Sequence, residues 1–391
     1  MVTAVTRGIP VTVVALPFVT AAVLAAVASW RIGTWINAGS ASLQFVVACL
    51  LVSRAGAAET HLVLLTAFVA MTTSWFGRRD IAAALAARSL GRRRARLYHV
   101  GYQALIGAVQ AATLAGDPIL TWLALVVAVA AAAVMTGAVR GPDAAAAASR
   151  LVLHCAIGLL LALLGTLLLD LTPAPASVFL LLGYGALAGL VPLHGWLANA
   201  SAEGVAPGAI IVTLLANVPL MLFMRFPIDP VLLIAFGLAS LLPGAVVLSA
   251  HLDRRRTVAL AGMAQFGMMV FAIGVGAKQV AWLHMTLLAL ARSAVLQSHD
   301  NVLAWLALAL LPLYALYLLA APTVAVAAWL LVPLAAGALL ACWALLDRHP
   351  TGVAGDRLAA TPTGLQLALI VLLAFAMPAQ VVAWFRAVAA G

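Results

Sequence analysis

Three histidines, His154, His194 and His284, lie within or at the ends of long apolar stretches of the chain. A histidine can bind and release a proton near neutral pH, whereas Arg292 keeps its proton. His284 and Arg292 are eight residues apart, a little over two turns of an α-helix, so both project from one helix face. These residue types indicate proton transfer within a membrane. The alternative for each histidine is a hydrogen bond between neighbouring helices.

The composition predicts an all-α membrane protein. Of the 391 residues, 66% are hydrophobic and 8% are charged, against about 25% charged in soluble domains. Each apolar run of about 20 residues predicts one spanning helix. We expect about fourteen transmembrane helices, at 9–29, 36–53, 60–77, 97–115, 118–139, 149–170, 176–197, 207–226, 230–250, 257–277, 280–298, 301–320, 322–346 and 363–386.

The positions of the cations predict the orientation of these helices. If the N-terminus lies outside, fifteen of the 21 lysine and arginine residues fall in cytoplasmic loops. This asymmetry predicts a multi-pass protein of the bacterial inner (cytoplasmic) membrane, with both termini outside. The net charge of +10 therefore reflects topology, and nucleic-acid binding is not expected.

The segment 76–98 contains seven arginines. Ile81, Leu85 and Leu90 have helical spacing in it, which favours a basic amphipathic helix on the membrane surface. We expect either a solvated loop or a docking surface for a soluble partner, and contact with anionic membrane lipids is compatible with both. A competing cytoplasmic face comprises 199–206 and 251–256. The candidate docking residues of the two surfaces are Arg92, Arg93, Arg94, Glu203 and Asp253.

The middle of the membrane contains few polar groups. All eleven acidic residues fall in loops or at helix ends. Asn217 lies near the middle of 207–226, and Pro219 follows it two residues later. Because proline removes a backbone hydrogen bond, we expect this helix to be interrupted between Pro207 and Pro219, with Asn217 facing the protein interior beside His194 or His284. The three cysteines form no C-x-x-C pair, so neither a disulfide framework nor a metal site is expected.

Two stretches carry a family resemblance: GLVPLHGWLANASAEGVAPGAIIVTLLANVPLMLFMRF (189–226) and DRRRTVALAGMAQFGMMVFAIGVGAKQVAWLHMTLLALARSAV (253–295). Both resemble the proton-conducting antiporter-like membrane subunits of respiratory complex I, Mrp antiporters and membrane hydrogenases. The resemblance is closest to the DabB branch, which comprises the membrane subunits of DAB inorganic-carbon accumulation complexes. The matching positions are Pro192, His194, Trp196, Leu197, Glu203, Pro207, Arg225 and Phe226, and then Asp253, Arg255, Gln265, Phe266, Gly267, His284 and Arg292.

The resemblance implies an antiporter-like fold with two inverted five-helix repeats and discontinuous helices. The expected divisions are the N-terminal helices with the basic segment (1–96), the first repeat (97–226), the second repeat (227–346), and a C-terminal loop and helix (347–391). Together with the polar residues described above, the resemblance suggests a proton path. Its candidate residues are His154, His194, Asn217, Arg255, Gln265, His284 and Arg292.

The chain departs from the family at several positions that carry protons. Asn217, Arg255 and Arg292 stand where the family has lysines. The family's helix-5 glutamate falls near Val127, and its second histidine is Leu288. Arginine does not release its proton near neutral pH, so only the three histidines can titrate.

Two functions follow from the residues and the resemblance. The first is the membrane subunit of a two-component, cation-gradient-coupled complex that accumulates CO2 and bicarbonate. Its partner would be a large cytoplasmic zinc subunit resembling a β-carbonic anhydrase, and the zinc would belong to that partner. The second is a non-conducting scaffold subunit of a complex I-, Mrp- or hydrogenase-like assembly. In both cases we expect no cofactor and no catalytic chemistry in this chain.

Overall fold

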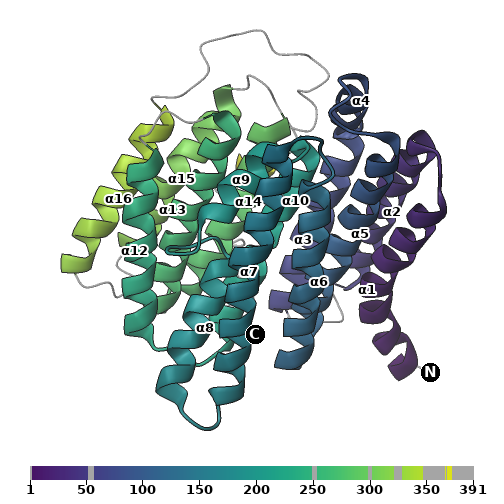
Figure 1. Ribbon diagram of the computed structural model, residues 1–391. Coiled ribbons are helices and arrows are strands. Elements are labelled where there is room, and N and C mark those ends of the chain that lie inside the picture. The colour runs from purple at the N-terminus through teal and green to yellow at the C-terminus, as the bar shows by residue number, and fades with distance from the viewer. Residues whose placement is uncertain are drawn as a thin grey trace. The chain divides into compact units, whose positions relative to one another are not determined.

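The computed structural model describes residues 2–51, 57–248, 253–297, 302–320, 328–346, 366 and 368–371. All regular structure in these residues is α-helical, which confirms the all-α prediction (Figure 1). The helices are α1 (Val2–Ala26), α2 (Trp30–Leu51), α3 (Ala57–Phe76), α4 (Arg78–Ala86), α5 (Arg92–Leu114), α6 (Pro118–Thr136), α7 (Pro142–Leu168), α8 (Pro173–Leu187), α9 (Gly195–Glu203), α10 (Ala206–Leu214), α11 (Asn217–Arg225), α12 (Pro230–Leu248), α13 (Arg254–Gly274), α14 (Lys278–Gln297), α15 (Val302–Ala320) and α16 (Ala328–Leu346).

Several of these helices are long and apolar enough to cross a membrane. In the described part of the chain there are seven, or eight if the bent pair Ala58–Phe76 and Arg78–Ala86 is one span. Three shorter apolar helices are present as well, at Val11–Ala26, Pro173–Leu187 and Leu330–Leu346. The chain is therefore a multi-pass membrane protein, but the count of fourteen spans is not confirmed. Most of the expected last helix, 363–386, lies outside the described residues.

The chain packs into two compact units, each described here by itself. The first comprises Met1–Leu159 and Asn199–Val218, and the second comprises Leu160–Ala198 and Pro219–Ala390. The sequence-based divisions at 96, 226 and 346 follow the repeats of the family and stay a prediction.

In the first unit α5 is the central helix. It packs against α1, α2, α3, α6 and α10 (Figure 1). Its buried face combines aromatic side chains, among them Tyr98 and Tyr102, with the polar side chains of His99 and Gln103. An amphipathic surface helix would bury one apolar stripe, whereas α5 is enclosed and buries polar groups too. These polar groups need partners on neighbouring helices.

The basic segment 76–98 is not one continuous helix. α4 ends at Ala86, the chain turns at Arg88 with a φ of 57°, and α5 begins at Arg92. Ile81 and Leu90 are only 3% and 2% exposed, so they pack inside the unit. The expected amphipathic surface helix is therefore wrong for these two residues, because the chain turns between α4 and α5 and both side chains pack inside the unit.

In the second unit α12 and α13 pack backbone to backbone. A Cβ atom placed at Gly237 would lie 2.5 Å from the backbone nitrogen of Phe271, and one at Gly267 would lie 2.6 Å from that of Leu241. Glycine is the residue that permits such an approach, and small residues of this kind bring membrane helices together. Gly267, in the second stretch that carries the family resemblance (253–295), therefore allows α13 to pack closely against α12.

The expected helix 176–197 ends earlier than the hydropathy indicates. α8 stops at Leu187, and Gly189 follows with a φ of +71°, a left-handed conformation that favours glycine. The Trp196 indole then donates a hydrogen bond of 2.8 Å to the Ala186 carbonyl. His194 consequently lies in the turn before α9, not in the last turn of a long helix.

Candidate functional site

His284 and Arg292 both lie on α14, where they are 2% and 3% exposed. α14 is continuous across both positions, so eight residues separate them by about 12 Å along the helix axis. Leu288 stands midway between them and is also buried. A titratable ring and a permanent cation are thus enclosed on one helix.

Two residues of α13 accommodate the guanidinium of Arg292. A Cβ atom at Gly262 would lie 2.8 Å from Arg292 Cζ, so the absence of a side chain there leaves the space that the guanidinium occupies. One turn further along, the ring of Phe266 lies 5.5 Å from Arg292 Cζ, within the range of a cation–π interaction. The Gly262–Phe266 spacing therefore positions the buried charge.

Five polar atoms of the buried residues Gln265, His284 and Arg292 have no hydrogen-bond partner among the described residues. They are Nδ1 and Nε2 of His284, Nε and Nη2 of Arg292, and Oε1 of Gln265. Gln265 also lies on α13, and its Nε2 donates a hydrogen bond of 3.4 Å to the Leu308 carbonyl of α15. Buried polar groups are almost always paired, and ionisable groups inside a membrane are costly. The site can therefore bind a proton at His284 in the field of a fixed positive charge.

The helix 207–226 is interrupted, as the sequence predicts. α10 ends at Leu214 and α11 begins at Asn217. Pro219 has no N–H to donate to the carbonyl of Leu215, and its ring would clash with that carbonyl in a continuous helix. Asn217 is 2% exposed, and its Nδ2 has no partner in the described part of the chain. The interruption thus leaves a neutral amide buried in the middle of a span.

The other candidates for the proton path lie in less enclosed positions. His154 is half-buried on α7, and its Nδ1 lies 2.7 Å from the Arg150 carbonyl of the same helix. His194 is half-buried in the turn before α9. Arg255 lies in the first turn of α13. Of the seven residues predicted for the path, Gln265, His284 and Arg292 lie buried on the packed pair α13 and α14.

The predicted docking residues are accessible to different extents. Arg92, Arg93 and Arg94 begin α5 and are exposed. Asp253 is exposed, caps α13 by accepting a hydrogen bond of 3.0 Å from the Arg256 amide, and pairs with the Arg256 guanidinium at 3.3 Å. Glu203 is half-buried at the end of α9. No group of three His, Cys, Asp or Glu side chains that could hold a metal ion occurs in the described ranges.

Sequence reasoning missed a seam of buried polar side chains between α2 and α5. His99 Nε2 lies 3.1 Å from Thr34 Oγ1. Gln103 donates a hydrogen bond of 2.9 Å to Asn37 Oδ1 and accepts one of 2.6 Å from Gln44. Polar residues recur every three or four positions along α2, and this spacing could have indicated a polar face inside the protein.

The comparison with protein families decides the identity of the fold. Residues 115–339 match the model described as "NADH:quinone oxidoreductase/Mrp antiporter, TM". The chain belongs to this antiporter-like family. The match spans α6 to α16 and includes the buried site on α13 and α14.

Relatives of known sequence or structure agree with this assignment. A "Hydrogenase-4 component F homolog" of Methylacidiphilum infernorum is 30% identical over 334 residues, covering 72% of this chain and 70% of that protein. The chloroplastic "NAD(P)H-quinone oxidoreductase subunit 5" of Brachypodium distachyon is 34% identical over 119 residues, covering 28% of this chain and 16% of that protein.

Solved structures confirm the antiporter-like fold. A chain of respiratory complex I from Thermus thermophilus superposes with a TM-score of 0.78 at 17% identity, over 96% of this chain and 98% of that one. A chain of the Mrp complex from Dietzia sp. DQ12-45-1b superposes with a TM-score of 0.76 at 14% identity, over 98% and 97%. At these identities the similarity establishes the fold alone.

Proposed function

We propose that the chain is a cation-coupled transport subunit of a multi-subunit membrane complex, and that His284 is its principal proton-binding residue. The observation that carries the proposal is the enclosed pair on α14, in which both ring nitrogens of His284 have no hydrogen-bond partner among the described residues. A histidine used to join helices would donate or accept a hydrogen bond.

In this mechanism His284 and Arg292 have separate roles. His284 binds a proton through a free ring nitrogen and releases it when its surroundings change. Arg292 retains its charge throughout, so it sets the electrostatic field but does not pass a proton on. Gln265 and Asn217 are neutral amides that can orient water or a moving cation without a desolvated charge.

The complex that we propose is the two-component inorganic-carbon accumulation system. The support is the resemblance of 189–226 and 253–295 to its membrane subunits. A large cytoplasmic zinc subunit would then supply the chemistry of CO2 hydration, and this chain would supply the proton path. We place the chain in a bacterial inner membrane with both termini outside, since the exposed arginines at the start of α5 would then face the cytoplasm.

The transport role is tested with His284→Ala in cells that depend on the complex for inorganic carbon. We expect carbon-dependent growth and uptake to be lost, while the membrane level of the protein and its co-purifying partner are unchanged. Met285→Ala is the matched control, because Met285 is equally buried one position along α14. Normal uptake by the His284→Ala variant would contradict the transport role.

The partner is tested by purification. Reversing Arg92, Arg93 and Arg94 to glutamate should weaken co-purification of a large zinc-containing subunit, and the loss should depend on salt concentration. Purification of the wild-type protein alone, stable and active in transport, would contradict the two-component assembly.

A second candidate function is a non-conducting scaffold subunit of a complex I-, Mrp- or hydrogenase-like assembly. The observation that favours it is the chemistry of Asn217 and Arg292, since one is neutral and the other permanently charged. Co-purification of quinone-, iron–sulfur- or hydrogenase-type subunits, with full activity in the His284→Ala variant, would support this function instead.

A further inference from the structure

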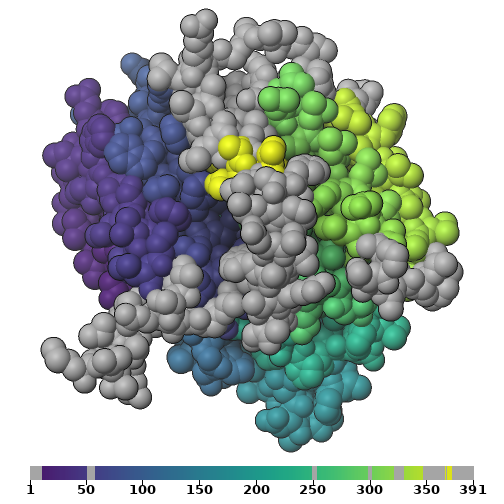
Figure 2. Space-filling view, turned by 180° about the vertical axis from the view of Figure 1, so that it is seen from behind, coloured from purple at the N-terminus to yellow at the C-terminus, as the bar shows by residue number. Residues whose placement is uncertain are grey.

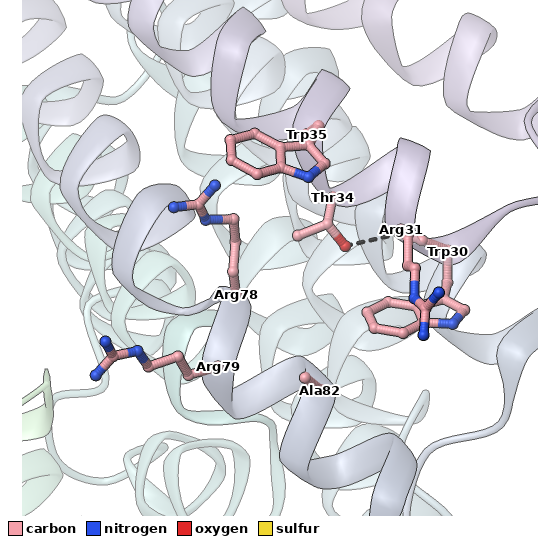
Figure 3. Close-up of a pocket in the computed structure, with 7 residues that line it drawn as sticks. All are labelled: Trp30, Arg31, Thr34, Trp35, Arg78, Arg79 and Ala82. Carbon is pink, nitrogen blue, oxygen red and sulfur yellow. Dashed lines mark hydrogen bonds between the residues drawn. The ribbon is translucent and has the colours of Figure 1, made fainter.

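A pocket of about 390 Å³ opens in the first unit between α2 and α4 (Figure 3). Its lining combines cationic and aromatic side chains from the two helices, and it includes no acidic residue. The lining residues are Trp30, Arg31, Thr34, Trp35, Arg78, Arg79 and Ala82. A pocket of this composition favours an anionic ligand.

Arg78 is held in place by its neighbours. Its guanidinium carbon lies 4.1 Å from the ring centroid of Trp35 and 4.5 Å from that of Trp75. Its Nε donates a hydrogen bond of 2.9 Å to the Trp75 carbonyl. Its Nη1 is buried and has no acceptor among the described residues. The cation is therefore held in a fixed position against the two indole rings, and one of its N–H donors has no acceptor among the described residues.

The pocket adjoins an apolar strip on α2. Trp35 lines the pocket and is also 58% exposed. Further exposed residues follow at helical spacing along α2, away from the arginines. They are Leu43, Val46 and Leu50, at 50%, 55% and 59% exposure. The space-filling view shows α1 and α2 at the surface of their unit, at the purple end of the scale (Figure 2). If the charged group of a ligand contacted the arginines, the rest of the ligand would lie alongside these exposed apolar side chains.

Tryptophan and arginine together are typical of the boundary between headgroups and hydrocarbon. We propose that this pocket binds the phosphate of an anionic phospholipid, with the acyl chains lying along the exposed strip of α2. The group that binds to the arginines is a phosphate monoanion. The adjoining apolar strip favours a lipid over free phosphate as the source of that group. The inference goes beyond the proposed transport function and does not depend on it.

Binding at the pocket would also affect hydrogen bonds in the interior of the first unit. Thr34 lines the pocket, donates a hydrogen bond of 2.8 Å to the Trp30 carbonyl and lies 3.1 Å from His99 Nε2. Because the Thr34 hydroxyl donates to Trp30, it accepts from His99. An occupied pocket should therefore stabilise the seam between α2 and α5, as any ligand of the folded state does.

The test measures retained lipid and thermal stability of the purified protein. Delipidated protein is titrated with phosphatidylglycerol, with phosphatidylcholine of the same chains, and with inorganic phosphate. We expect phosphatidylglycerol to bind and to raise the unfolding temperature, phosphatidylcholine to do so weakly, and inorganic phosphate to have little effect. If inorganic phosphate stabilised the protein as much as phosphatidylglycerol does, the proposal that the phosphate belongs to a lipid would be overturned. If phosphatidylcholine stabilised it as much, the preference for an anionic lipid would be overturned.

Two variants locate the lipid. Arg31→Gln with Arg78→Gln should lower phosphatidylglycerol affinity by about fivefold for each charge removed. The matched control is Arg140→Gln with Arg150→Gln, which removes the same charge from exposed positions outside the pocket and should leave affinity within about twofold. Equal losses in both pairs would show that only net charge attracts lipid, and the pocket would be rejected.

Ala82→Phe is the second variant, and it keeps every charge. Ala82 is half-buried in the wall of the pocket, so a phenyl ring there should fill it. We expect the loss of high-affinity phosphatidylglycerol binding with an unchanged helical content. Wild-type lipid affinity in this variant would overturn the proposal even if the double arginine variant does not fold.

Discussion

Two sets of buried polar side chains, one in each unit, differ in their hydrogen bonding. In the first unit His99 and Gln103 bond across to α2, and Tyr102 bonds at 2.6 Å to Thr73 of α3. In the second unit His284 and Arg292 are as deeply buried, yet most of their polar atoms have no partner in the described residues. Similar residue types thus link helices in the first set and have polar atoms without partners in the second.

This difference separates structural from functional polarity inside a membrane. A paired polar side chain joins two helices and contributes about 0.6 kcal/mol on average. An unpaired ionisable group in the same surroundings is costly and marks a candidate functional site. Replacing a paired side chain should therefore change stability, and replacing an unpaired ionisable one should change activity.

The largest effect is expected at His284. Replacing it with glutamine removes the titratable group at similar volume and should lower cation-coupled transport by about 100-fold or more. His99→Gln is the matched variant in the paired seam, and it should retain transport per folded molecule. Transport measured in proteoliposomes checks both, and equal losses would remove the distinction between the two units.

The next effect is expected at Gly262. A methyl group there would lie 2.8 Å from the Arg292 guanidinium, so Gly262→Ala should displace the charge. Overpacking of this kind costs about 1–3 kcal/mol, and we expect transport to fall with it. Transport and thermal unfolding are measured together, with Ala261→Gly as a neighbouring control. Unchanged values would show that the position of Arg292 is not critical.

A smaller effect is expected at Gln103. Gln103→Leu removes its bonds to Asn37 and Gln44 and should lower stability by about 1–2 kcal/mol. Because the seam is structural, the activity of the molecules that remain folded should be unchanged. Thermal unfolding in detergent, together with transport normalised to folded protein, provides the measurement. A selective loss of transport would place the seam on the conduction path.

The smallest effect is expected at Gln110, one of several buried polar side chains of the first unit that have an atom without a partner among the described residues. It is fully buried, and neither amide atom has a partner among the described residues. Gln110→Leu should leave transport unchanged and raise stability by about 0.5 kcal/mol, the low end of the cost of an unpaired buried amide. A clear loss of transport in the same assays would assign Gln110 to function.

Much of the secondary structure follows from local sequence. Long apolar runs predict spanning helices because the backbone must satisfy its own hydrogen bonds in lipid. The break near Asn217 follows from Pro219, whose effect is confined to one turn. The end of α8 was missed because Gly189 acts through a single left-handed residue that hydropathy does not detect.

The residues of the candidate site were visible in the sequence, but their surroundings were not. His284 and Arg292 stand out because charge and titratable rings are rare in apolar helices. Tertiary structure alone showed that Gly262 makes room for Arg292, that Gln103 is paired and that Ile81 is buried, because each depends on which helices meet. Hydropathy is a property of one segment, whereas hydrogen-bond pairing is a property of two, and no single segment of the sequence specifies its neighbour.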